Sequence, residues 1–346
     1  MAEPPATLRD VANAARVHPA TASRALNPET RVLVSDETAR RVADAAAALG
    51  YRPNPVARSL RTRRSHTIGV LIPDLNNPLF PPMVRGLEDG LTNAGYVALL
   101  GNTDGDTGKE QAIFEQMRAR HVDGFVLATA RAHDPVLAEV ARDELPVVLM
   151  NRLDPEHDFS SVSVDNEHGM RMSVSHLVAL GHTRIAHIAG PRQVSTGEGR
   201  RRGYYEGLKT ANLDPDEDLI VAAAGFTVEE GVRCCRELLQ RHHRDGQARF
   251  TAIAVANDML AVGCFTALDE AGLSCPDDLS LVGFNDMPFV DRLRPPLTTI
   301  RFPHYQLGRE AAQLLLDQVD RADATAKVLY LEPELVVRGS TGPPRG

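Results

Sequence analysis

The sequence contains no long apolar segment, because none of its hydrophobic runs approaches the ~18 residues that a membrane-spanning helix requires. Its opening residues, MAEPPATLRD, include no apolar stretch of the kind found in secretory signal peptides. The cysteines form neither a C-x-x-C pair nor a spacing typical of metal sites, which favours buried free thiols in a reducing compartment. We therefore expect a cytoplasmic protein that has no membrane partner.

The sequence also lacks the signatures of common catalytic sites. It has no Walker A lysine motif, no G-x-S-x-G segment and no H-E-x-x-H segment. The stretch GEGRRRG, Gly197 to Gly203, resembles a nucleotide-binding loop, but it does not directly follow the preceding apolar strand as a dinucleotide fingerprint requires. These features predict that the chain is not an enzyme and that it needs no cofactor or metal.

The charge of the chain is unevenly distributed. The formal net charge is −8, yet residues 1–66 hold 11 arginines and 6 acidic residues, so this segment carries +5 and the remainder −13. Residues 50–66 contain five arginines and no acid. A basic head on an acidic body indicates a polyanionic partner for the head, although a solvated charged face would have the same composition.

The N-terminal segment has the pattern of three short helices. Residues 7–10, TLRD, match a capping box and precede apolar residues at helical spacing. Pro19 can start a second helix, because the first position of a helix needs no backbone N–H. Ser35 can cap a third helix, with Leu49 on its inner face and Gly50 at its end. With a tight turn before Pro19, this pattern is that of a helix-turn-helix.

The segment that follows, residues 53–65, has the composition of a linker. Asn54 can cap and Pro55 can start a helix that runs through Leu60 between arginines. A helix this short is marginal in water, because its nucleation is costly. We expect a linker that is helical only when a partner orders it.

Beyond the linker, apolar segments alternate with amphipathic segments of helical periodicity. Continuous apolar strands separated by helices indicate parallel sheets that are covered on both faces. There are too many strands for one small sheet, so two doubly wound halves are expected, at about residues 66–160 and 162–290. Within residues 291–340, a helix at 304–319 and a strand at 327–337 would complete the body.

Polar side chains follow several of these strands directly. The pairs are Asn151-Arg152, Asp165-Asn166, Asn257-Asp258 and Asn285-Asp286. Turns and helix N-caps use the same residue types, so any single pair is weak evidence for a site. In open α/β sheets, however, ligands bind beyond the carboxyl ends of strands, and such pairs in both halves favour a binding cleft.

The chain resembles the LacI/GalR (lactose-repressor) family of bacterial transcription factors over essentially its whole length. The segments that carry the resemblance are TLRDVANAARVHPATASRALN (7–27), VSDETARRVADAAAALGYRPNPVARSLRT (34–62), IGVLIPDLNNPLF (68–80), VDNEHG (164–169), LGHTRIAHIAGP (180–191), VANDMLAVG (255–263), LVGFNDMPF (281–289), RPPLTTIRFP (294–303) and ELVVRGSTGP (334–343).

The family implies an N-terminal all-α helix-turn-helix domain (1–52) and a hinge helix with linker (53–65). It implies an α/β, periplasmic-binding-protein-like core of two doubly wound parallel-sheet subdomains (66–346) that dimerises and binds a small effector. The function that follows from the resemblance is a sequence-specific DNA-binding repressor under effector control.

The resemblance also implies which residues meet double-stranded DNA. Pro19, Ala20 and Arg24 would face base edges in the major groove, with Arg24 reading a guanine through O6 and N7. Leu60 would enter the minor groove and kink the duplex. Because two hinges must meet there, the protein would bind a pseudo-palindromic operator as a homodimer. Phosphate contacts are implied for Thr21, Ser23 and Asn27. The complete implied set is Thr7, Leu8, Pro19, Ala20, Thr21, Ser23, Arg24, Asn27, Tyr51, Asn54, Val56, Ala57 and Leu60.

For the effector, the resemblance implies that Phe80 stacks on the ligand. The implied polar ligands are Asn151, Arg200, Asn257 and Asn285. Arg200 is chosen from three consecutive arginines because it lies three residues before Gly203. Relatives often carry Asp at the positions of Asn151 and Asn285, and an amide both donates and accepts, which indicates a neutral polyol or sugar.

Two positions in the head depart from the usual residues of the family, since Arg16 and His18 stand where Gly and Ser are common. Arg16 would be forced to a positive φ at a cost of about 1 kcal/mol. His18 would cap the second helix less well than serine, at a cost of about 1 kcal/mol. We therefore expect a head of reduced stability.

Two other functions remain to be weighed against the repressor. A sugar-binding or transport protein could use the same core, but the missing signal peptide and the basic head argue against it. An enzyme is disfavoured because no nucleophile, base or metal set is visible.

Overall fold

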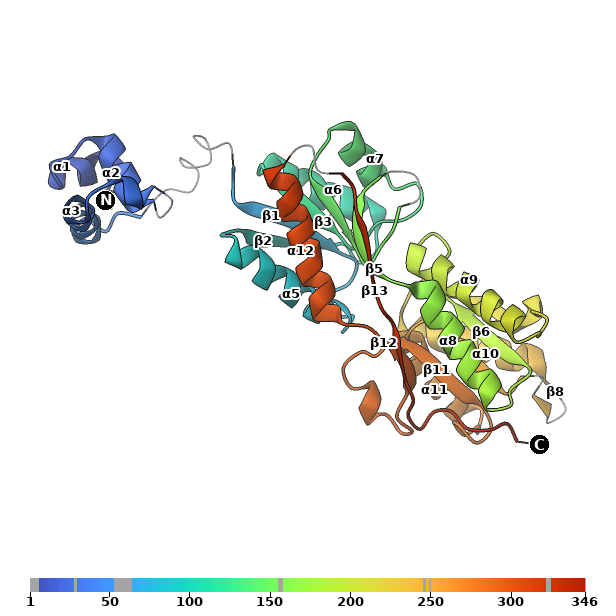
Figure 1. The fold of residues 1–346 in the computed structure, drawn as a ribbon. Helices are drawn as coiled ribbons and strands as arrows, with labels where there is room; N and C mark the ends of the chain where they lie inside the picture. The colour runs from blue at the N-terminus through green and yellow to red at the C-terminus, as the bar shows by residue number, and fades with distance from the viewer. Residues whose placement is uncertain are drawn as a thin grey trace. The chain divides into compact units, whose positions relative to one another are not determined.

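The chain forms two compact units, Met1–Ser65 and His66–Gly346, in the computed structural model shown in Figure 1. The described residues are 6–27, 30–52, 64–154, 158–244, 247–248, 250–321 and 325–345. The hinge helix expected to run through Leu60 lies outside them, and so do Asn54, Val56 and Ala57. Within the described part of the chain, no helix is long and apolar enough to cross a membrane.

The N-terminal unit is a head of three helices. They are α1 (Leu8–Ala14), α2 (Pro19–Leu26) and α3 (Asp36–Ala48), and the short 3-10 helix η1 (Arg31–Leu33) precedes α3. The expected helix starts are confirmed, with a capping box at Thr7, Pro19 first in α2 and Ser35 as the cap of α3. Leu49 is 41% exposed rather than inward, because it is the C-cap and lies one residue beyond α3. The buried core of the head consists of Val11, Ala12, Ala15, Ala22, Ala25, Ala39, Val42 and Ala46.

The helices α1 and α3 end in the same backbone motif. After α1, the Arg16 N–H donates to Asn13 O at 3.1 Å. The Val17 N–H then donates to Ala12 O at 2.9 Å. This pair of bonds requires a left-handed residue between helix and loop. Gly50 fills that position after α3 with φ +61°, whereas Arg16 fills it after α1 with φ 51°, as expected.

At the start of α2, His18 is the N-cap in place of the expected serine. The Nδ1 atom of His18 accepts a hydrogen bond from the Ala20 N–H at 3.2 Å. The imidazole therefore supplies the acceptor that serine would have given, which offsets part of the expected cost. Because an imidazole nitrogen accepts only while it is unprotonated, this cap needs the neutral ring with its proton on Nε2.

The core unit contains two six-stranded sheets. The first contains, in spatial order, β13 (Val328–Leu331), β5 (Ser160–Val164), β4 (Val147–Met150), β3 (Gly124–Leu127), β1 (Thr67–Ile72) and β2 (Val97–Asn102), all paired in parallel. The second contains β14 (Glu334–Val336), β12 (Thr298–Arg301), β11 (Ser280–Asn285), β10 (Ala252–Val255), β6 (Ile185–Ala189) and β7 (Ile220–Ala222), parallel except for the antiparallel pair β12–β14. The expected pair of doubly wound parallel sheets is therefore confirmed.

Helices connect the strands and cover the sheets (Figure 1). They are α5 (Phe80–Asn93), α6 (Thr107–Ala119), α7 (Pro135–Arg142), α8 (Asn166–Ala179), α9 (Ser195–Thr210), α10 (Val228–His242), α11 (Asp258–Glu270) and α12 (His304–Asp320), with the 3-10 helices η2 (Glu217–Leu219) and η3 (Val290–Arg292) and a small pair of strands, β8 (His243–Arg244) and β9 (Gln247–Ala248). The helices α5 and α12 pack very closely: a Cβ on Gly86 would lie 1.9 Å from Tyr305 O, and one on Gly308 would lie 1.9 Å from Met83 O.

The positions at which the chain crosses from one sheet to the other differ from the subdomain boundaries expected from the sequence. The boundary expected at residues 160–162 falls inside β5, which belongs wholly to the first sheet. The single strand expected at 327–337 is two strands, β13 in the first sheet and β14 in the second. Pro333 lies between them and has no N–H to continue a ladder. A single-sequence pattern shows strands but not the remote partners with which they pair.

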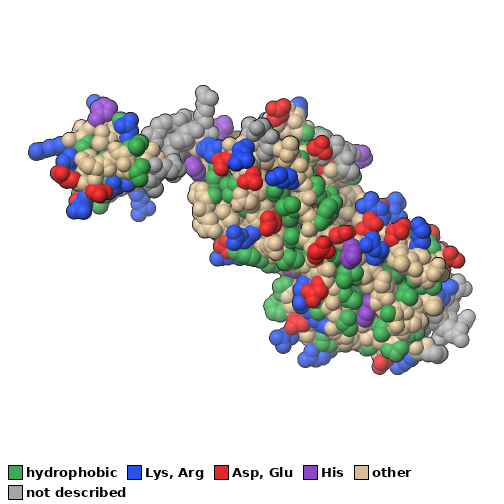
Figure 2. All heavy atoms as spheres, in the orientation of Figure 1, with side chains coloured by type: hydrophobic (Ala, Val, Ile, Leu, Met, Phe, Trp, Pro, Cys, Tyr) green, Lys and Arg blue, Asp and Glu red, His purple; other side chains and the backbone are tan. Residues whose placement is uncertain are grey.

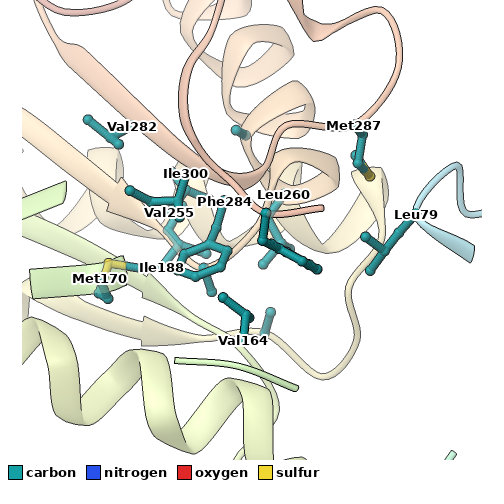
Figure 3. Packing of buried hydrophobic residues seen from close by; sticks show 14 of the residues in the cluster. Leu79, Val164, Met170, Ile188, Val255, Leu260, Val282, Phe284, Met287 and Ile300 are labelled. Atoms are coloured by element: carbon teal, nitrogen blue, oxygen red, sulfur yellow. The ribbon is translucent and has the colours of Figure 1, made fainter. Parts of the chain in front are cut away.

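One apolar cluster extends across both halves of the core. Figure 3 shows Met170, Ile188, Val255, Phe284 and Ile300 packed together around the second sheet, and all are buried. The same cluster includes residues of the first half, such as Leu79 and Val164. The two halves therefore share buried apolar contact beside the chain crossings that join them.

The motif shared by α1 and α3 predicts the effect of a glycine at residue 16. Arg16→Gly should raise the free energy of unfolding of the head by about 1 kcal/mol, because glycine adopts positive φ without the steric cost of a Cβ. In the full-length protein, hydrogen exchange of the α1 amides should slow about fivefold. Arg40→Gly removes the same charge inside α3 and should accelerate exchange there instead. If Arg16→Gly and Arg40→Gly changed hydrogen exchange in the same direction and by the same amount, the steric cost of the left-handed backbone at Arg16 would be contradicted.

Candidate functional site

The core unit contains a cavity of about 360 Å³ that residues from both halves line. Phe80 and Asn151 contribute from the first half, and Arg200, Asn257 and Asn285 contribute from the second. The structure thus brings together all the residues that the resemblance implied as effector ligands. They are far apart in the sequence, so only the fold makes them neighbours.

The ends of strands and the starts of helices explain this convergence. Asn151 directly follows β4, Asn285 is the last residue of β11, and Phe80 is the first residue of α5. Asn257 stands before α11, and its Oδ1 accepts from the Leu260 N–H at 2.9 Å. Asn257 is therefore a helix cap and a cavity residue at once, so the two interpretations of the polar pairs are compatible.

Arg200 is the most extensively bonded of these side chains. It projects from α9 and is 2% exposed. Its Nε donates to Asn166 Oδ1 at 2.8 Å and its Nη1 to Ala256 O at 2.7 Å. Its Nη2 donates to Asn285 Oδ1 at 3.1 Å, and the guanidinium carbon lies 3.8 Å from the centre of the Phe284 ring. Burial lowers the pKa of Arg200 to about 9, so it stays cationic at neutral pH.

The two arginines that follow Arg200 do not line the cavity. Arg201 pairs with Glu198 at 3.0 Å, and Arg202 pairs with Glu167 at 3.5 Å. Successive residues of a helix point about 100° apart, so only one of three neighbours can face a given space. The whole GEGRRRG stretch lies inside α9, which confirms that it is not a nucleotide-binding loop.

The aspartates of the polar pairs support the cavity wall from behind. Asp286 accepts from Arg301 Nε and from Arg338 Nη2, both at 2.6 Å. Asp258 accepts from the Thr299 hydroxyl at 2.6 Å, and burial raises its pKa to about 7. Asp286 follows Asn285, whose φ is +117°. These bonds hold the unusual backbone that presents the Asn285 amide to Arg200.

Two further arginines line the cavity, and the resemblance did not imply either of them. Arg152 is 6% exposed, and its Nη1 donates to Asn151 O at 2.6 Å. Its Nε has no partner among the described residues, and the same is true of the buried Asn151 Oδ1. Arg131 lies in the loop after β3. The position of Arg152 directly after β4 was a signal for a site, whereas Arg131 carries no motif.

In the head, the outer face of α2 presents the side chains implied for base reading. Arg24 and Ala20 are exposed and lie one helical turn apart, while Pro19 is half-buried. The inner face is fixed by the buried Ala22 and Ala25. Figure 2 shows basic side chains, all of them arginines, at the surface of this unit. Of the other implied DNA contacts, Thr7 is exposed, and the half-buried ones are Leu8, Thr21, Ser23, Asn27 and Tyr51.

No metal chemistry is indicated by the residues that the structure describes. They contain no group of His, Cys, Asp or Glu that could hold a metal ion. All four cysteines are free; Cys234, Cys235 and Cys264 are buried, and Cys275 is half-buried.

Comparison with known proteins covers both units. Residues 7–54 match the model of bacterial regulatory proteins of the lacI family, and residues 174–341 match a periplasmic binding protein-like domain. The HTH-type transcriptional repressor CytR of Escherichia coli K12 is 35% identical over 98% of this chain and 97% of its own length. The ribose operon repressor of Bacillus subtilis is 34% identical over 97% of this chain and 98% of its own.

Solved structures agree with this assignment. The lac repressor dimer bound to operator and an anti-inducer covers 98% of this chain and 100% of its own, with 28% identity and a TM-score of 0.85. The complex of the regulator CelR with cellobiose covers 97% of this chain and 99% of its own, with 31% identity and a TM-score of 0.74. The chain, which is not an enzyme, therefore belongs to the LacI family of bacterial transcriptional repressors, with a helix-turn-helix head and a periplasmic-binding-protein-like core.

Proposed function

We propose that this repressor acts in the cytoplasm as a homodimer on a pseudo-palindromic operator, and that a sugar or related polyol in the core cavity controls its binding. The observation that carries the proposal is the convergence of Phe80, Asn151, Arg200, Asn257 and Asn285 on one cavity. Amide and guanidinium groups around an aromatic side chain suit a ligand that is rich in hydroxyl groups.

Relatives support both the proposed binding to operator DNA and the proposed sugar effector. The lac repressor structure is a dimer on operator DNA. CelR binds cellobiose, and a LacI-family regulator from Enterococcus faecium, 28% identical over 81% of this chain, holds ribose. Together with the cavity in the core of this chain, these relatives make a sugar-like effector the simplest expectation.

The connections of the core indicate how a ligand would act at a distance. The ligand would touch both halves, and these are joined where the chain passes from β5 to α8, from β12 to α12 and from β13 to β14. The chain enters the first half at His66, whose N–H donates to Asp123 Oδ2 at 2.8 Å. A change in closure would thus move the point from which the linker departs. The ligand achieves this only by binding one closure state more tightly.

The exposed position of Arg24 predicts a specific defect. Arg24→Ala should reduce the preference for operator over unrelated DNA by about 1–3 kcal/mol, roughly ten- to a hundredfold, because bidentate bonds to a guanine are lost. Competition binding assays on the full-length protein measure this preference. Arg40→Ala removes an exposed arginine from α3 and should leave the preference unchanged. If Arg24→Ala weakened both kinds of DNA equally, Arg24 would be a phosphate contact only.

The cavity predicts a variant that responds less sensitively to the effector while keeping its fold. Asn151 has φ +57°, and its buried Oδ1 has no partner among the described residues, so Asn151→Gly removes the amide without strain or an orphaned neighbour. With a panel of sugars, about tenfold more effector should be needed to alter operator binding, the cost of one hydrogen bond.

Asn212→Gly is the matched control for that experiment. Asn212 also has a left-handed backbone, with φ +55°, but it is exposed after α9 and lies away from the cavity. It should respond to the effector as the wild type does. A response of Asn151→Gly at wild-type concentrations would place the effector elsewhere.

A further inference from the structure

Two arginine side chains that line the cavity are buried without an ionic partner. Arg152 is 6% exposed and Arg200 is 2% exposed, and neither forms an ion pair with a residue that the structure describes. The oxygens that accept their hydrogen bonds belong to backbone carbonyls and amides. Buried charges are normally paired, because an ion that leaves water loses its hydration. Neither buried arginine therefore has a carboxylate in direct contact among the described residues.

The arginines also act unfavourably on one another. Burial first, and then the charge of Arg131, lower the pKa of Arg152 to about 10. Burial first, and then the charge of Arg152, lower the pKa of Arg200 to about 9. Arg131 lines the same cavity, and its Nη2 lies 3.9 Å from Glu110 Oε2. Three cationic side chains thus surround one space.

The acidic groups nearby offset only part of this charge. Glu110 and Asp258 act on the buried arginines, but burial raises the pKa of each carboxyl to about 7. At neutral pH, each of these two carboxyl groups is therefore only partly ionised. Among the acids that line the cavity, Asp104 is already paired with Lys109, which leaves Asp74.

One helix start adds positive potential to the same space. The first residue of α9 follows Val194, and this N-cap residue provides no side-chain cap. Val194 and Thr196 both line the cavity. The N–H groups at a helix start favour an anion. The start of α5 adds no such donors, because the Phe80 N–H donates to Asn77 O at 3.1 Å and the next two residues are prolines.

We infer that the effector carries an anionic group, a phosphate or a carboxylate, which Arg152 and Arg200 bind in the cavity with Arg131 beside them. The inference rests on the proposed function and narrows its ligand class. The unpartnered Asn151 Oδ1 accepts a hydroxyl of the same ligand. The effector is thus a sugar phosphate or a sugar acid rather than the neutral sugar that Asn151 and Asn285 alone suggested.

Inorganic phosphate is the first probe. The full-length wild type is melted in increasing phosphate, against chloride at equal ionic strength, beside Arg152→Gln and Arg202→Gln. Arg202 is the matched control, since it is exposed and pairs with Glu167 outside the cavity. The wild type and Arg202→Gln should show the same saturable rise in melting temperature. Arg152→Gln should lose that rise, and Arg152→Lys, which keeps the charge, should retain part of it.

Each outcome of the phosphate titration decides the question. No rise in the wild type, or an equal rise in Arg152→Gln, overturns the inference, because phosphate then binds elsewhere or not at all. Without phosphate, Arg152→Gln should melt no lower than the wild type, since it removes a buried charge that is only partly compensated. A variant that does not fold by circular dichroism is replaced in the comparison by Arg152→Met.

Matched sugar pairs then identify the anion and separate this inference from the proposed function. The probes are ribose with ribose 5-phosphate, and glucose with glucose 6-phosphate and glucuronate, scored by their effect on operator binding. A charged member should act at a concentration at least tenfold below its neutral parent in the wild type but not in Arg152→Gln. A neutral parent that acts equally well overturns the anionic inference and leaves the proposed function standing. A wild type that binds no operator removes the proposed function, while the phosphate titration still judges the anion site.

Discussion

The buried guanidinium of Arg200 is the constraint on which the wall of the core cavity depends. Arg200 cannot be held in an apolar interior unless its donors are bonded. Its bonds reach Asn166 at the start of α8, Ala256 after β10 and Asn285 at the end of β11. Those bonds fix the positions of three segments at once, so the wall of the second half is preorganised before any ligand arrives. The hydrogen bonds that Arg301 and Arg338 donate to Asp286 then hold the backbone that presents Asn285.

The opposite wall is built differently, and the difference has a mechanistic consequence. In the first half, Arg152 Nε and Asn151 Oδ1 are buried with no partner among the described residues. In the second half, by contrast, the guanidinium of Arg200 already donates three hydrogen bonds to protein oxygens. Unmade bonds to buried polar groups are costly, so a ligand that completes them stabilises the arrangement in which both walls contact it. Under the proposed function, the hydrogen bonds that a ligand would newly complete lie mainly in the first half, to which the linker is attached at His66.

Much of the architecture follows from local pattern, because helix caps and apolar periodicity are local effects. The capping box at Thr7, Pro19 at the start of α2 and the left-handed Arg16 were all predictable for that reason. The division of the core was not, since the sequence of β5, SSVSV, does not show which strands it pairs with, and only its pairing with β4 and β13 assigns it to the first sheet. Arg152 shows the same limit at the site. Its position after β4 is visible in sequence, but its burial without a carboxylate in direct contact among the described residues depends on the fold.

The turn that precedes α2 shows how the head tolerates an unfavourable residue. Arg16 adopts a backbone conformation that glycine would adopt at a saving of about 1 kcal/mol. Unlike the arginines of the cavity, its side chain is exposed and keeps its hydration. Its charge adds to a head that carries +5 in the first 66 residues. A partner of high negative charge is bound through such cations with a strong dependence on salt. The strain at Arg16 therefore lowers the stability of the free head, while its added charge favours the DNA-bound state.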